Sequence, residues 1–339
     1  MIVKLMRDKL GTALTRILFL LALGFNLASC DQSSQDANTP AEEANTPPPI
    51  TPIEPTLAAA LKHYQHAQIH ALSATSTCVE SFAANIDLFL TAPTQPLLND
   101  NQQALQHCLN LYIPIHTLMK EESNKPLQAL TTPLIASVYS TPILPGYVDY
   151  LVQYPNSGIV NDITLTLSEL SLRGQQGLTD SGEVSIGFEV IAFILMGEQR
   201  YNQSLAPRPS NDFEEPHANR RREYLRIAVS LLQQDLTALQ AVLNNVITLP
   251  NEATQPEALQ TTRNILNTMR VNIEQQNLDS LSLGYWELLK YTTPQSEVSK
   301  PNNDAGVTLA TYLKWPQQTP DLSREAFTAQ LKASLQRLQ

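Results

Sequence analysis

The longest glycine-free stretch of the chain runs from Phe25 to Pro145, and it narrows the choice of fold more than any other feature. Hairpins and sandwiches of β-strands need glycine at their tight turns, so a stretch of this length favours long helices with few connections. The whole chain has 11 glycines in 339 residues, which is below half of the usual share of about 7%. We therefore predict an all-α fold.

Hydrophobic periodicity predicts the same class. Apolar side chains recur at three- and four-residue steps over residues 57–89, an amphipathic pattern that ends at the loop containing Pro93 and Pro96. A second stripe over residues 105–115 predicts a helix antiparallel to the first, and a third lies over residues 225–246. Further helices are predicted at 160–173, 183–198, 256–276 and 321–338.

This number of helices favours two helical bundles packed together over one oversized bundle. We assign residues 57–200 to an N-terminal bundle and residues 201–339 to a C-terminal bundle.

The first 30 residues have the layout of a secretory signal. Basic residues precede an apolar run, and Leu27-Ala-Ser-Cys30 resembles the lipobox of bacterial lipoproteins. We expect residues 1–29 to be removed and Cys30 to be lipidated; a short transmembrane anchor is the alternative. Residues 30–56 are acidic and proline-rich, which predicts a disordered tether. The expected location is the periplasmic side of a bacterial membrane, with membrane lipid as a partner through Cys30.

Charge and hydropathy exclude two classes of protein. The chain has 22 basic and 32 acidic side chains, a net charge of −10, so it lacks the basic surface that a nucleic-acid-binding protein needs. No apolar run reaches the roughly 20 residues that cross a bilayer, which excludes a polytopic membrane protein.

Cys78 and Cys108 fall at similar heights on the first predicted hairpin. A disulfide is one interpretation in an oxidising periplasm, and two buried thiols are the other, because the bond requires Cα atoms within about 7 Å. Both interpretations give the cysteines a structural role, since no Cys–His–Asn arrangement is evident.

Glu189 is the candidate site residue. It is the only ionisable group in Val184–Met196, a segment that is apolar nearly all round and is therefore expected to be buried. A buried carboxylate must pair with a cation, accept hydrogen bonds, bind a metal ion or stay protonated. We predict Arg221 as its partner, because Arg221 shares the inward stripe of its helix with Leu225. A purely structural Glu189 is the alternative.

Three histidines, His63, His66 and His70, have a spacing that could collect a metal ion on one helical face. They fall opposite the apolar stripe, so we interpret them as part of a solvated polar face. The sequence contains no H-E-x-x-H, no phosphate-binding glycine loop and no G-x-S-x-G.

Several segments resemble the imelysin-like family. That family has G-x-H-x-x-E followed by an apolar run and W-G; here Gly187 and Gly197 match, while Glu189 replaces the histidine, Ala192 the glutamate and Met196 the tryptophan. Three other segments resemble the family's P-x-x-x-x-I-D-Y, R-P-x-T-D-F and R-R-x-Y-L, in that order: Pro145–Tyr150, Arg208–Phe213 and Arg221–Leu225. Together these segments lie between Pro145 and Leu225, in the middle of the chain that follows the tether.

The resemblance implies a fold of two helical bundles with a site near their junction, and an association with bacterial iron uptake; the family is filed among peptidases. Glu189 would be the residue that remains of that site, and it would bind iron or another metal ion. The family motifs add possible site partners: Arg221, Asp149, Arg208 and Asp212.

Catalysis is disfavoured by the replaced residues, because a hydrolytic metal site needs about three protein ligands. We expect a non-enzymatic binding protein with a degenerate metal site, which would work with a component of iron uptake. The alternatives are a metallopeptidase and an interaction protein without a small ligand.

Overall fold

The computed structural model describes residues 55–122, 125–214, 218–246, 255–275, 279–291, 307–316 and 323–339. Their regular secondary structure is helical, apart from one isolated bridge between Leu151 and Tyr154. The all-α fold class is confirmed. Among these residues no helix has both the length and the apolar character that crossing a membrane requires. The predicted signal peptide, Cys30 and nearly all of the tether lie outside the described residues.

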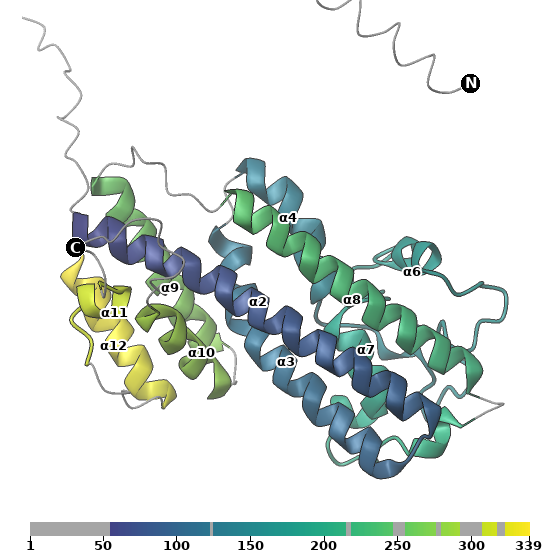
Figure 1. The fold of residues 1–339 in the computed structure, drawn as a ribbon. Helices are drawn as coiled ribbons and strands as arrows, with labels where there is room; N and C mark the ends of the chain where they lie inside the picture. Colours follow the sequence, from purple (N-terminus) through teal and green to yellow (C-terminus); the bar gives the residue numbers. More distant parts are fainter. Residues whose placement is uncertain are drawn as a thin grey trace, which may run out of the picture. The chain divides into compact units, whose positions relative to one another are not determined.

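Helices α2 (Pro55–Thr91) and α3 (Gln95–Glu122) form the antiparallel hairpin predicted from the sequence (Figure 1). The stripe on residues 57–89 is the buried face of α2, and α3 is longer at both ends than the predicted 105–115. These side chains of the stripe are at most 2% exposed: Leu57, Leu61, Tyr64, Leu72, Val79, Phe82, Ile86 and Phe89.

Three helices pack against this hairpin. The predicted stripe at 225–246 lies on α8 (Asn219–Val246), which contacts α2 and α4 (Lys125–Val138). Helix α7 (Phe188–Met196) lies against α3 and α8, and eight of its nine residues are buried. A helix that is apolar all round is stable only in an interior, so the composition of α7 explains its position.

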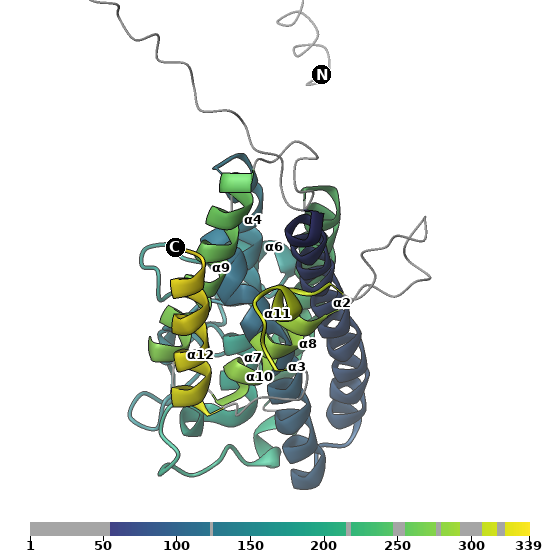
Figure 2. The same cartoon turned by 90° about the vertical axis from the view of Figure 1, so that its left-hand side faces the viewer.

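The C-terminal helices are α9 (Gln255–Gln275), α10 (Asp279–Lys290), α11 (Leu309–Tyr312) and α12 (Arg324–Arg337). Figure 2 shows α12 beside α9, and α10 packs on α2 and α3. Trp286 of α10 stacks on Trp315 with ring centroids 5.9 Å apart. Gly284 lets α10 approach α3 closely, because a Cβ atom there would collide with the ring of Pro114.

Helices α2 and α3 run through both groups of helices. Near its end α2 contacts α8, where Arg222 donates to the Leu90 carbonyl oxygen at 2.6 Å. Closer to its start α2 contacts the C-terminal group, where His70 packs on Tyr291. The division into two bundles at residues 200/201 stays a prediction, since these two helices belong to both groups.

The segment between α4 and α8 is mostly irregular. It contains α5 (Pro145–Val148), α6 (Glu169–Gln175) and the 3₁₀ turns η2 (Gly197–Arg200) and η3 (Ser210–Phe213). The helix predicted at 160–173 is wrong for residues 160–168, because Ser168 is extended and caps α6 through the backbone N–H of Ser171. The helix predicted at 183–198 begins only at Phe188. Helices α4, α5, α10 and α11 were not predicted.

Candidate functional site

Glu189 lies in the first turn of α7, and its side chain is 4% exposed. Two glycines fix the ends of this helix. Gly187 has φ +94°, and a Cβ atom there would lie 2.5 Å from the Ser137 carbonyl oxygen. Gly197 ends the helix at φ +64°, a conformation that favours glycine. The family-like positions Gly187 and Gly197 therefore hold α7 in place, and Ala192 contributes only a buried methyl group.

The cation that pairs with Glu189 is Arg200, at the end of η2. Its Nη2 donates to Oε1 at 2.6 Å and its Nε donates to Oε2 at 3.1 Å, a bidentate ion pair. Arg200 also donates to the Gln106 side-chain oxygen at 3.4 Å. Burial alone would lower the pKa of the Arg200 guanidinium, but the hydrogen bond and charge of Glu189 outweigh burial and raise it. The guanidinium of Arg200 therefore stays charged beside the carboxylate of Glu189.

The predicted pairing of Glu189 with Arg221 is wrong. Arg221 donates instead to Asp149, with Nε 2.6 Å from Oδ2 and Nη2 3.0 Å from Oδ1. The inward stripe of α8 correctly indicated that Arg221 points into the protein, but the stripe cannot identify the carboxylate. Arg200 was missed because the chain turns back at Gly197, eight residues after Glu189, and spacing along one helix cannot predict such a return.

The four possible site partners named from the sequence lie together, around the buried carboxylate of Asp149. Arg208 is 3.2 Å from Asp149 and donates to Asp212 at 2.9 Å. Arg221 completes the group, and Tyr150 donates to Asp212 at 2.7 Å beneath both guanidinium groups. The cluster joins α5, η3 and α8. Its charges pair with one another rather than with Glu189, so we interpret it as a structural connection.

Two tyrosines lie beside the Glu189 carboxylate: the Tyr201 hydroxyl donates to Oε2 at 3.4 Å, and the Tyr139 hydroxyl also interacts with it. Tyr139 is packed edge-on against His116, and Tyr112 packs on Phe188 with ring centroids 5.6 Å apart. Burial and the charge of Glu189 raise the pKa of Tyr139 to about 12, and the same two causes raise the pKa of Tyr201. These phenols keep their protons near neutral pH, so they provide neither a base nor an anionic metal ligand.

The donor set around Glu189 does not fit a metal ion. Among the described residues no three His, Cys, Asp or Glu side chains lie close enough together to hold one, and this includes His63, His66 and His70. A cation at Glu189 would first have to displace both hydrogen bonds from Arg200. The site consists of an ion pair with an aromatic wall, and it lacks the ligands that activate water at a hydrolytic metal centre.

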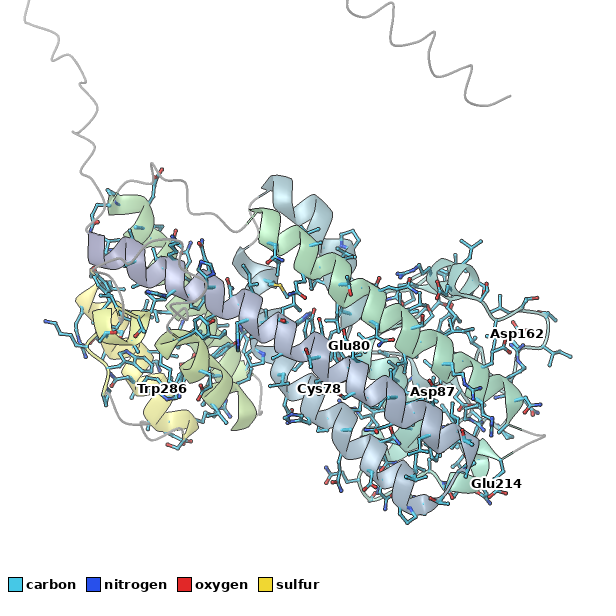
Figure 3. The ribbon with its side chains drawn as sticks, in the orientation of Figure 1. Cys78, Glu80, Asp87, Asp162, Glu214 and Trp286 are labelled. Carbon is cyan, nitrogen blue, oxygen red and sulfur yellow. A yellow bond between two sulfur atoms is a disulfide. The ribbon has the colours of Figure 1, made fainter. Side chains whose placement is uncertain are left out.

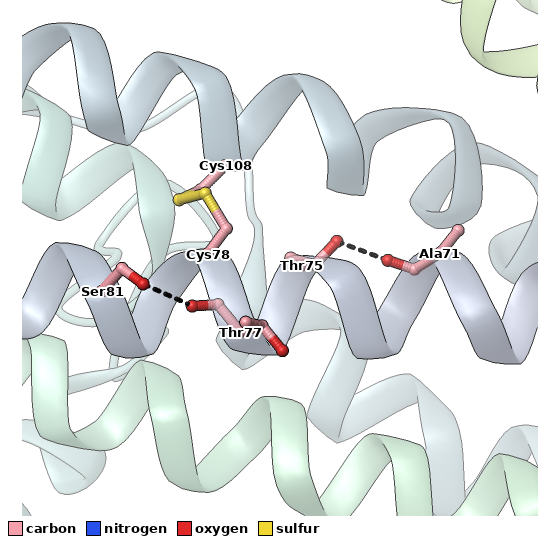
Figure 4. The surroundings of a disulfide bond; sticks show 6 residues. All are labelled: Ala71, Thr75, Thr77, Cys78, Ser81 and Cys108. Atoms are coloured by element: carbon pink, nitrogen blue, oxygen red, sulfur yellow. Dashed lines mark hydrogen bonds between the residues drawn. A yellow bond between two sulfur atoms is a disulfide. The ribbon is translucent and has the colours of Figure 1, made fainter.

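A disulfide joins Cys78 of α2 to Cys108 of α3, with Cα atoms 5.5 Å apart (Figure 4). Of the two interpretations that the sequence left open, the structure has the bonded one. Cys108 is two residues from Gln106, which contacts Arg200. The bond therefore fixes the part of α3 that lies beside the ion pair.

Three consecutive arginines in the first turn of α8 bind different sets of acceptors. Arg220 donates to four carbonyl oxygens of one loop, those of Ile159, Val160, Asp162 and Leu165, at 2.7–3.1 Å. Arg221 binds Asp149, and Arg222 binds the carbonyl oxygens of Phe213 and Leu90. Successive helical residues point about 100° apart, which explains why neighbours reach different targets. The sequence shows the three arginines, but not their partners.

Comparison with known proteins adds no family to these observations. The chain matches no protein-family model, and a search of curated proteins finds no relative.

Proposed function

We propose that the protein is a lipid-tethered, non-enzymatic binding protein on the periplasmic side of a bacterial membrane, a divergent imelysin-like protein that serves iron uptake by binding a partner component. In this proposal the guanidinium group of Arg200 has taken the place of a metal ion at Glu189. The resemblance of the sequence motifs supports the family and the pathway, and the lipobox-like Leu-Ala-Ser-Cys30 supports the anchor.

The observation that carries the proposal is the bidentate pair between Arg200 and a carboxylate that is 4% exposed. A buried carboxylate is stable only when a cation or donors compensate its charge. Arg200 supplies both a positive charge and two donors. A metal ion would gain one protein ligand at Glu189 and would leave Arg200 without its partner, so the exchange is unfavourable.

Catalysis is a poorer explanation of the same geometry. A metallopeptidase needs an activated water and a group that accepts its proton. Glu189 is already engaged with Arg200, and the phenols of Tyr139 and Tyr201 have raised pKa values. We therefore assign the protein a binding role.

Metal titration tests the Arg200 proposal. Calorimetry with zinc and with ferric citrate should give no heat of specific binding for the wild-type protein or for Glu189→Gln. The matched control is Asp235→Asn, which weakens another bidentate pair, that of Asp235 with Arg173. One-to-one metal binding by the wild type and by Asp235→Asn, lost in Glu189→Gln, would overturn the proposal.

Two further measurements address the anchor and the absence of catalysis. Labelling of growing bacteria with an alkyne fatty acid should mark the wild-type protein but not Cys30→Ser, and equal labelling of both would contradict the anchor.

Digestion of a general peptide library by the purified protein should not exceed that by Glu189→Gln. Chelator-sensitive digestion that requires Glu189 would establish a metallopeptidase instead.

A further inference from the structure

Exposed apolar side chains are concentrated in one segment of the protein. Among the described residues ten large apolar side chains are exposed, and eight of them lie between residues 144 and 205; the other two are Leu88 and Leu283. The most exposed are Ile163 at 85% and Leu170 at 84%. We group these eight side chains, which share one stretch of the chain, under the name 144–205 surface: Leu144, Val152, Tyr154, Ile163, Leu170, Leu178, Tyr201 and Leu205.

The backbone that displays this surface is firmly held. Arg220 binds four carbonyl oxygens of the loop that contains Ile163. The backbone N–H of Leu144 donates to the Gly182 carbonyl oxygen at 2.8 Å, which ties the start of the segment to the turn after Leu178. Glu169 of α6 accepts hydrogen bonds from α8 beside Leu170. A partner would meet an already ordered surface and pay little conformational entropy to bind it.

The charged side chains that residues 144–205 present to the solvent are negative. The five outward carboxylates of this segment form no ion pair; they accept hydrogen bonds from backbone N–H, hydroxyl or amide groups. The segment contains no lysine, and its two arginines pair with Asp235 and Glu189. The five carboxylates are those of Asp162, Glu169, Asp180, Glu183 and Glu198.

Two of these carboxylates, Asp162 and Glu183, have lowered pKa values and stay ionised near neutral pH. Hydrogen bonds from the hydroxyl and backbone N–H of Thr164 lower the pKa of Asp162, and those of Thr179 lower the pKa of Glu183. The 144–205 surface therefore combines apolar contact area with a persistent negative charge.

We propose that the 144–205 surface docks a cationic amphipathic polypeptide, one that places Leu- or Ile-like side chains between Lys or Arg residues. This inference deepens the proposed function and rests on its assignment of a binding role. Charge complementarity selects this partner, because an interface with matched potentials attracts the right partner and repels wrong ones. An anionic lipid surface and a second copy of this acidic chain would both be repelled.

The position of the surface agrees with a protein partner. Figure 3 shows Asp162 and Asp87 toward the same end of the helices, and Asp87 forms an ion pair with Arg226 of α8. Helix α2 has 37 residues, which is about 55 Å at 1.5 Å per residue. The loop of Asp162 thus lies far along α2 from Pro55, where the segment that leads to the predicted lipid anchor ends.

The test uses the full chain and a fluorescent 18-residue peptide of leucine and lysine with helical periodicity. Two comparison peptides have glutamate in place of lysine, or serine in place of leucine. Fluorescence anisotropy should show binding of the Leu/Lys peptide, at least tenfold tighter than of either comparison peptide. Equal binding of the Leu/Glu peptide, or no binding of the Leu/Lys peptide, would overturn the proposal.

Matched variants locate the binding. Ile163→Ser with Leu170→Ser should weaken it about tenfold, and Leu88→Ser with Leu283→Ser should leave it unchanged. Glu169→Gln with Glu183→Gln should weaken binding at low salt and flatten its salt dependence. Circular dichroism should show the same helix content for all variants. An equal loss in the Leu88/Leu283 variant would overturn the proposal.

Two other occupants are outcomes of the same experiment. Binding to vesicles of anionic lipid, or self-association of the wild type, that is lost in the Ile163/Leu170 variant would assign the surface to a membrane or to a second copy and would overturn the proposal. Failure here is distinct from failure of the metal prediction, since neither comparison depends on Glu189.

Discussion

Removal of Arg200 while Glu189 is kept should be costly, and the cost can be worked out from the site. The substitution Arg200→Met keeps most of the side-chain volume but removes two charged hydrogen bonds, at 2.6 and 3.1 Å. Breaking a fully buried ion pair by removing one partner costs about 3–5 kcal/mol. Because Arg200 is 21% exposed and Glu189 is 4% exposed, water compensates part of this loss, and we expect about 3 kcal/mol.

Removal of Glu189 instead should cost less. In Glu189→Gln the side-chain shape is kept, an amide oxygen still accepts from the guanidinium, and Arg200 can turn toward water. We expect a loss of about 1 kcal/mol. The double variant should be more stable than Arg200→Met alone by about 1–2 kcal/mol, because it no longer contains a buried carboxylate that has lost its cation.

Urea unfolding followed by circular dichroism at pH 7 measures all three variants. The control is Arg270→Met, which removes the partner of Glu274 in an exposed pair on α9 and should cost less than about 0.5 kcal/mol. A double variant no more stable than Arg200→Met would refute our account of the site.

Three further predictions concern the framework. Loss of the bond between Cys78 and Cys108, whose sequence separation is 30, should lower the free energy of unfolding by about 3.6 kcal/mol from loop entropy; urea unfolding with and without a reductant measures it, and a loss below about 1 kcal/mol contradicts it. Gly284→Ala should lower Tm because the new Cβ meets a proline ring of α3, costing about 2 kcal/mol, whereas Gly174→Ala, with open space around it, should raise Tm. Arg220→Ala should speed cleavage of its loop by thermolysin and leave the helix content unchanged, since four carbonyl oxygens lose their donor; an unchanged cleavage rate would contradict this.

Long amphipathic helices were predictable from the sequence, because each buries one face and the period of 3.6 residues shows which face it is. The stripes at 57–89 and 225–246 correspond to α2 and α8, and the predicted 256–276 and 321–338 correspond to α9 and α12. The burial of Glu189 was also predictable, since the segment around it is apolar on every side.

Partners distant along the chain were not predictable in the same way. The pairing of Glu189 with Arg200 depends on a chain reversal at Gly197, and the pairing of Arg221 depends on Asp149, which lies 72 residues away. The irregular loop of residues 159–165 is shaped by the guanidinium of Arg220 rather than by its own periodicity. Periodic patterns along the sequence identify the buried face of each helix. These contacts depend instead on how the helices and loops pack against one another.

The sharing of α2 and α3 has a consequence for how the protein unfolds. Helix α2 contacts α8 and helix α3 contacts α7, and both α2 and α3 also contact α9 and α10. Neither group of helices can separate without exposing apolar surface of α2 and α3, the two helices on which the other group also packs. Heating should therefore give one sharp transition rather than two, and damage to the C-terminal helices should be felt as far away as the ion pair.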